Sequence, residues 1–103
     1  MKPPITATKV KPELQALRTQ LDNIDGQLIK LLTRRFKLTR QVGLLKRHHG
    51  LPVVDKNREA AMFVRITGLA QSAGVNPKLA RNILRLIIAE VVKIHRAIKQ
   101  GAQ

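Results

Sequence analysis

The sequence predicts an all-α fold of three helices, one long and two of medium length. Apolar residues recur at alternating intervals of three and four, which is typical of helices that bury one face. No long stretch alternates apolar and polar residues with the period of two that marks a strand. A glycine and an Asn-Pro pair, which are helix stop and start signals, divide the second half of the chain.

The first predicted helix runs from residue 12 or 13 to about His48. Proline is favoured in a first helical turn, and Glu13 suits the positive end of a helix. About 35 helical residues span about 52 Å, whereas a compact chain of this size has a radius of gyration of only about 13 Å. One apolar seam follows the helix, and because it is too long for the chain to cover, we expect a homodimer. The seam consists of Leu14, Leu17, Leu21, Ile24, Leu28, Leu31, Leu38, Val42 and Leu45.

One position of this seam, between Leu31 and Leu38, is occupied by Arg35. A guanidinium there is unfavourable unless an anion meets it or its charged head reaches water along a buried stem. No acidic residue occurs between Gly26 and Val54. Arg35 is therefore the first candidate for binding an anionic ligand.

Two further cations are related to Arg35 by helix geometry. Lys46 follows almost three turns later, on the same face and about 16 Å away along the axis, although such a lysine is often only a surface residue. Arg18 points about 100° away and lies about 25 Å distant. Arg18 cannot reach the same site within one chain, but an antiparallel partner chain would bring it there. The geometry predicts a basic pocket assembled across a dimer.

The second and third helices are marked by their ends. Gly43, inside the first helix, predicts a close approach of another helix or a ligand. Residues 51–54 form an extended connector, because a residue before proline avoids the helical region. Asp55 is expected to cap a second helix that ends at Gly74, with an apolar face of Ala61, Met62, Ile66, Leu69 and Ala73.

The Asn76-Pro77 pair starts a third helix that runs to about Lys99. Its apolar stripe consists of Ala80, Leu84, Ile87, Val91, Ile94 and Ile98. His95 adds a polar tip to this helix, and Glu59 adds a carboxylate to the first turn of the second. Together with the cations of the first helix, these side chains could close a small pocket, although a lone histidine on an apolar face is more often a hydrogen-bonded core residue.

The N-terminal residues and the composition limit the number of domains and the classes of partner and location that are open to the chain. Residues 1–12 are rich in proline and lysine and are expected to form a flexible basic tail, which leaves one helical domain over 13–100. The net charge of +14 indicates an anionic partner, with nucleic acid, an acidic protein and a small polycarboxylate all open. There is no cysteine, and neither a metal-ligand spacing nor a phosphate loop is visible. Without a secretory h-region or a membrane-length apolar run, a cytoplasmic location is expected.

Four motifs carry a resemblance to a known family: ELQALRTQLDNIDGQLIKLLTRR, QVGLLK, LPVVDKNRE and LRLIIAE. With them, residues 13–98 resemble the small all-helical chorismate mutases of the bacterial type. The resemblance implies an intertwined dimer of three-helix chains with two equivalent sites. It implies an isomerase that converts chorismate to prephenate by a Claisen rearrangement, in aromatic amino acid biosynthesis and without cofactor or metal. The substrate has two carboxylates, which would supply the anion that Arg35 lacks.

The same resemblance implies roles for individual residues. Arg35 and Lys46 would line the site, with Lys46 reaching the ether oxygen and a carboxylate of chorismate. Arg18 would come from the partner chain. The ring hydroxyl of chorismate would be met from the second helix by Asp55 and Glu59, with Arg58 in support.

The third helix departs from the family at two positions. Val91 stands where many members have a serine that touches a carboxylate. His95 stands where many have a glutamine that donates to the ether oxygen. A neutral imidazole donates one hydrogen bond and an imidazolium donates two, so our hypothesis is that His95 replaces the glutamine as donor. Both departures leave room for a poor mutase, or for one that is activated by a partner enzyme of the same pathway.

Three alternatives remain at this stage. Isochorismate pyruvate lyase shares the scaffold, the double arginine and Lys46, although the D-x-x-R-E motif with Glu59 favours the mutase. A basic nucleic-acid binder suits the charge, but no recognition-helix motif is visible, and Phe36 and Phe63 are the only aromatic residues available for stacking. A non-catalytic dimer is disfavoured by the intact set of candidate site residues.

Overall fold

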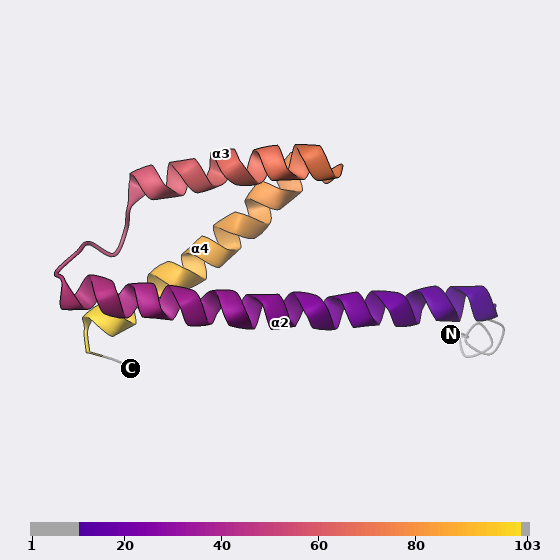
Figure 1. The fold of residues 1–103 in the computed structure, drawn as a ribbon, viewed down its shortest axis with the longest axis horizontal. Helices are drawn as coiled ribbons and strands as arrows, with labels where there is room; N and C mark the ends of the chain where they lie inside the picture. The colour runs from indigo at the N-terminus through magenta and orange to yellow at the C-terminus, as the bar shows by residue number, and fades with distance from the viewer. Residues whose placement is uncertain (1–10, 102–103) are drawn as a thin grey trace, which may run out of the picture. The chain divides into compact units, whose positions relative to one another are not determined.

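The computed structural model describes residues 11–101, which hold three α-helices (Figure 1). Helix α2 covers Pro12–His48, α3 covers Lys56–Ala73 and α4 covers Pro77–Lys99. The described residues include no strand, so the predicted all-α class and the helix bounds are confirmed. Most of the tail predicted over 1–12 lies outside the described residues. The chain divides into two compact units, one up to Arg35 and one from Phe36 onward, and α2 contributes to both.

The helix ends follow the expected chemistry. The Asp55 side chain accepts a hydrogen bond from the backbone N–H of Arg58 at 3.0 Å and caps α3. Gly74 ends α3 with a φ of 75°, in the left-handed region that glycine enters without strain. The Asn76 side chain caps α4 by accepting from the N–H of Lys78 at 2.9 Å, with proline at the start of the helix. The three predicted end signals are confirmed.

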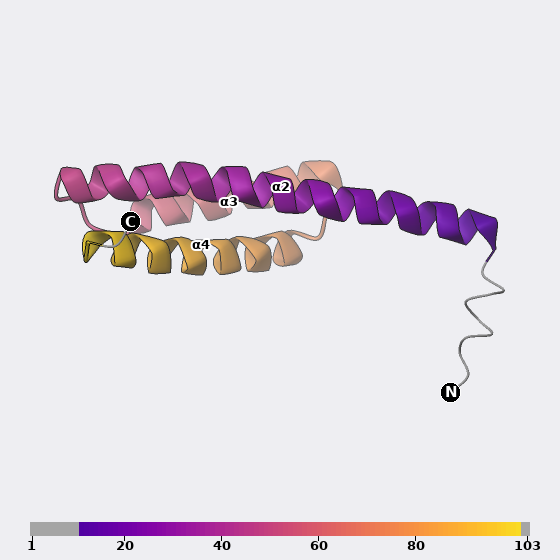
Figure 2. The same cartoon turned by 90° about the horizontal axis from the view of Figure 1, so that it is seen from below.

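In the unit from Phe36 onward, α3 and α4 meet at the turn after Gly74 and diverge from there (Figure 1). The far end of α4 lies beside the last turns of α2 in both views (Figures 1 and 2). Leu84 and Ile98 of the predicted α4 stripe are buried and its other members are half-buried, which confirms that stripe.

The buried face of α3 differs from the predicted one. Met62 and Ile66 are half-buried as expected, but Leu69 is 47% exposed and Ala61 and Ala73 are exposed too. The buried residue of α3 is Ala70, and α4 covers this neighbouring side of the helix. Intervals of three and four define two adjacent apolar faces on such a helix, and the position of α4 decides which of them is covered.

The seam of α2 is uncovered in the single chain. Its side chains are exposed over the whole length of the helix, with values such as 58% for Leu21, 54% for Leu28 and 62% for Leu38. The buried residue of α2 is Gly43, which lies beside the seam and faces α4. Within the unit from Phe36 onward, the seam residues Leu38, Val42 and Leu45 are likewise exposed, so this part of the seam is not what packs α2 against α4.

Candidate active site

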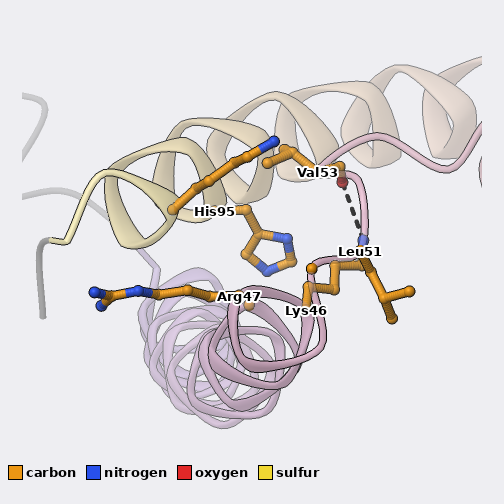
Figure 3. Close-up of a pocket in the computed structure, with 8 residues that line it drawn as sticks. Lys46, Arg47, Leu51, Val53 and His95 are labelled. Carbon is orange, nitrogen blue, oxygen red and sulfur yellow. Dashed lines mark hydrogen bonds between the residues drawn. The ribbon is translucent and has the colours of Figure 1, made fainter.

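A pocket of 260 Å³ opens where the last turns of α2, the connector after it and the last turns of α4 come together (Figure 3). All of these parts belong to the unit from Phe36 onward. Its volume is slightly below the range of about 300–1,000 Å³ that is usual for small-molecule sites. Its lining consists of Gly43, Lys46, Arg47, Gly50, Leu51, Val53, His95 and Lys99.

Lys46 connects α2 to the connector at one side of this pocket. Its half-buried side chain donates a hydrogen bond from Nζ to the carbonyl oxygen of Val53 at 3.0 Å (Figure 3). An ammonium has three donors, so two N–H groups remain for a ligand. The bond holds the connector against the end of α2 and fixes the position of the ammonium in the pocket.

His95 enters the pocket from α4 and rests directly on the backbone of α2. The residue is 5% exposed, and its Nε2 donates to the carbonyl oxygen of Thr39 at 2.6 Å. A Cβ atom added at Gly43 would lie 2.6 Å from Cδ2 of this ring and 3.0 Å from Cδ1 of Ile98. The close approach predicted from Gly43 is confirmed, and the imidazole of His95 is what approaches.

The charged residues that line the pocket are all cationic. Lys46 and Arg47 come from α2 and Lys99 from α4, whereas no aspartate or glutamate lines it. Figure 3 shows the guanidinium of Arg47 extending away from His95, and its Nη2 would lie 3.9 Å from a Cβ atom placed at Gly101. A pocket with this lining suits a small anion.

The structure brings together Lys46 and His95 of the eight predicted site residues. Arg35 is half-buried and Arg18 is exposed, and both lie on the part of α2 that precedes Phe36. The remaining predicted residues belong to α3, its cap and α4, and none lines this pocket: Asp55 and Arg58 are exposed, Glu59 and Val91 half-buried.

Sequence reasoning missed several of the lining groups. Lys99 follows His95 by one helical turn, so the interval of four could have found it. The carbonyl oxygen of Val53, which lines the pocket, and that of Thr39, which lies behind His95 and does not line it, are backbone acceptors that no residue type reveals. The pocket predicted from three helices thus takes its polar groups from α2, the connector and α4, and the carboxylate expected from Glu59 does not line it.

Residues 11–101 contain no group of three or more histidine, aspartate or glutamate side chains placed to hold a metal ion. In the same part of the chain, none of the helices combines the length and the apolar character that a membrane span requires.

The family model described as chorismate mutase type II matches residues 17–96. Three curated relatives support the match. The T-protein of Enterobacter agglomerans is 40% identical over 76% of this chain and 21% of its own length. The bifunctional chorismate mutase/prephenate dehydratase of Aquifex aeolicus is 34% identical over 84% of the chain and 25% of its own length.

The 4-amino-4-deoxychorismate mutase of Streptomyces venezuelae is 30% identical over 80% of this chain and 80% of its own length. The chain thus spans about a fifth of the T-protein (21%) but most of the Streptomyces relative. A match over residues 17–96 covers the three described helices almost from end to end. The chain belongs to the chorismate mutase type II family.

Proposed function

We propose that this protein is a chorismate mutase that rearranges chorismate to prephenate. The observation that carries the proposal is the cationic pocket in which Lys46 and His95 meet, in a chain of this family. A dicarboxylate is the kind of ligand that such a lining attracts, and no carboxylate of the pocket competes for the cations. The pocket is also small, as a site for a compact substrate should be.

The reaction needs positioning and electrostatics rather than a nucleophile. In a Claisen rearrangement one carbon–oxygen bond breaks while one carbon–carbon bond forms, and no proton is transferred. An enzyme accelerates it by holding the substrate in the cyclic shape and by placing donors where charge develops on the ether oxygen. Lys46 has two free N–H groups for this purpose, and its hydrogen bond to the carbonyl oxygen of Val53 fixes their position.

The remaining site residues keep the roles that the resemblance implies. Arg35 would bind a carboxylate of the substrate, and Arg18 of the partner chain would bind the substrate from the other side of the site. Asp55 and Glu59 would lie near the ring hydroxyl with Arg58 in support, and Val91 would be an apolar contact. Asp55 already caps α3 through one carboxylate oxygen, Oδ1, so its second oxygen is the one available to a substrate.

The uncovered seam supports a homodimer. Side chains such as Leu17, Leu21 and Leu28 are each more than half exposed, and a continuous apolar stripe of this length marks a contact surface. A second copy of the chain has a seam of the same length and chemistry. Pairing of two α2 helices would cover both seams and would supply Arg18 to the site of the other chain.

The proposal also includes the bounds of the domain, its location and a partner enzyme. The helical domain is proposed to cover residues 13–100, and its location to be cytoplasmic. The Aquifex relative is named for both a chorismate mutase and a prephenate dehydratase, which makes an enzyme of the same pathway a reasonable partner for a chain that spans a quarter of that relative. The positive charge beyond the pocket would then serve an acidic surface of this partner.

The test is turnover of chorismate, followed by absorbance with the products separated. Arg35→Ala should abolish prephenate formation, because one carboxylate of the substrate loses its guanidinium. Arg34→Ala is the matched control, since Arg34 is exposed next to it on the same helix, and it should retain activity. Formation of salicylate and pyruvate from isochorismate instead would establish the lyase. Preference for 4-amino-4-deoxychorismate would establish the activity for which the Streptomyces relative is named.

A further inference from the structure

The two nitrogens of the His95 ring have unlike surroundings. Nε2 donates to the carbonyl oxygen of Thr39, and a carbonyl oxygen can only accept. Nε2 therefore carries a hydrogen whether the ring is neutral or charged, and Nδ1 is the nitrogen that gains or loses a proton. Figure 3 shows one ring nitrogen directed at α2 and the other on the side of Lys46 and Val53. Nδ1 is thus the atom that a ligand in the pocket would meet.

Packing fixes this orientation of the ring. The Cβ position of Gly43 lies 2.6 Å from Cδ2 and 3.1 Å from Nε2 of His95, so the imidazole is seated on bare backbone. The residue is 5% exposed, and turning the ring over would break the bond to Thr39. Gly43 is consequently a positioning residue, because any side chain there would lift the ring from the carbonyl.

The charge of the ring decides what Nδ1 offers. A neutral ring with its hydrogen on Nε2 presents a lone pair at Nδ1, which repels the ether and carboxylate oxygens of a substrate. A protonated ring presents an N–H donor there. The charged residues that line the pocket are Lys46 and Arg47 from α2, the latter with its guanidinium directed away from His95, and Lys99 from α4, with no carboxylate among them. A bound dicarboxylate therefore brings the opposite charge that favours the protonated ring.

We propose that His95 binds the substrate through Nδ1–H as an imidazolium, so that the dicarboxylate binds together with one proton. This proposal rests on the mutase function proposed above. The proton comes from solvent on binding, stays on Nδ1 during a rearrangement that neither makes nor consumes protons, and returns to solvent when the product leaves. His95 can then replace the glutamine as a hydrogen-bond donor only when its ring is protonated.

The first part of the test needs no turnover. Long-range ¹H–¹⁵N spectra distinguish the two neutral tautomers and the imidazolium, and His95→Gln assigns the His95 signals against those of His48 and His49. At about pH 8 the free protein should show the neutral tautomer with hydrogen on Nε2. A bicyclic ether dicarboxylate that mimics the cyclic transition state should convert the ring to the imidazolium. A neutral ring in this complex, or hydrogen on Nδ1 in the free protein, would overturn the proposal.

The second part is the pH dependence of kcat/KM for chorismate. Wild type should lose about tenfold per pH unit once the free ring is neutral, whereas His95→Gln should show no such decline. His48→Gln is the control, because His48 is exposed and does not line the pocket, and it should keep the wild-type profile. If wild type and His95→Gln both turn over chorismate with equal pH profiles, the proposed role of the His95 ring is refuted but the mutase function is not. Absence of both turnover and binding would refute the mutase function, and the proposal with it.

Discussion

Gly43→Ala tests the contact on which the candidate site is built. In an open helix, alanine is more stable than glycine by about 1 kcal/mol. At Gly43, however, the added Cβ would lie 2.6 Å from a ring atom of buried His95 and 3.0 Å from Ile98. Overpacking of this kind destabilises by about 1–3 kcal/mol, so we expect a net loss of about 0–2 kcal/mol, the difference between these two effects.

The assay is urea unfolding, with Gly68→Ala as the matched control. A Cβ at Gly68 meets nothing within 4 Å, and this substitution within α3 should raise the free energy of unfolding by about 1 kcal/mol. In a His95→Ala background, most of the loss caused by Gly43→Ala should disappear, because the ring atom is gone. If Gly43→Ala stabilised wild type as much as Gly68→Ala does, the described packing of the His95 ring against Gly43 would be wrong.

Three other substitutions test separate parts of the structure. Asp55→Ala should lower the free energy of unfolding by about 1 kcal/mol through loss of the α3 cap, and Asp55→Asn by much less, since asparagine caps equally well; equal losses in urea unfolding would argue against the cap. Lys46→Met should raise amide hydrogen exchange around Val53 and lower chorismate turnover, and an unchanged exchange rate would show that the connector does not depend on the lysine. Leu28→Glu should give monomers in sedimentation velocity, while Gln27→Glu, of equal charge change, should not; a dimer that survives Leu28→Glu would place the interface elsewhere.

Local signals in the sequence predicted most of the fold. The helix ends depended on Asp55, Gly74 and the Asn76-Pro77 pair, whose effects act within one helical turn and are therefore readable from neighbours. Gly43 likewise predicted a close approach, because a helix rarely accepts glycine without a packing reason. The approaching group could not be named, since it comes from a residue more than fifty positions away.

The candidate site was less accessible to sequence reasoning. Lys46 and His95 were predicted from their positions on the helices and from the family resemblance, and both line one pocket in the structure. Their partners are the backbone oxygens of Val53 and Thr39, and the position of a carbonyl depends on the fold rather than on the residue type. The covered face of α3 was missed for a related reason, because periodicity defines apolar faces but not the neighbour that packs on one of them.

The sparse interior of the single chain has a thermodynamic consequence. Among the described residues, the buried apolar side chains are Ala70, Leu84 and Ile98, while the seam of α2 remains in contact with water. If a second copy covers the seam, folding and association are one bimolecular reaction, and the midpoint of unfolding rises with protein concentration. Dilution alone would then act as a denaturant, and two variants would be comparable only at the same molar concentration of chains.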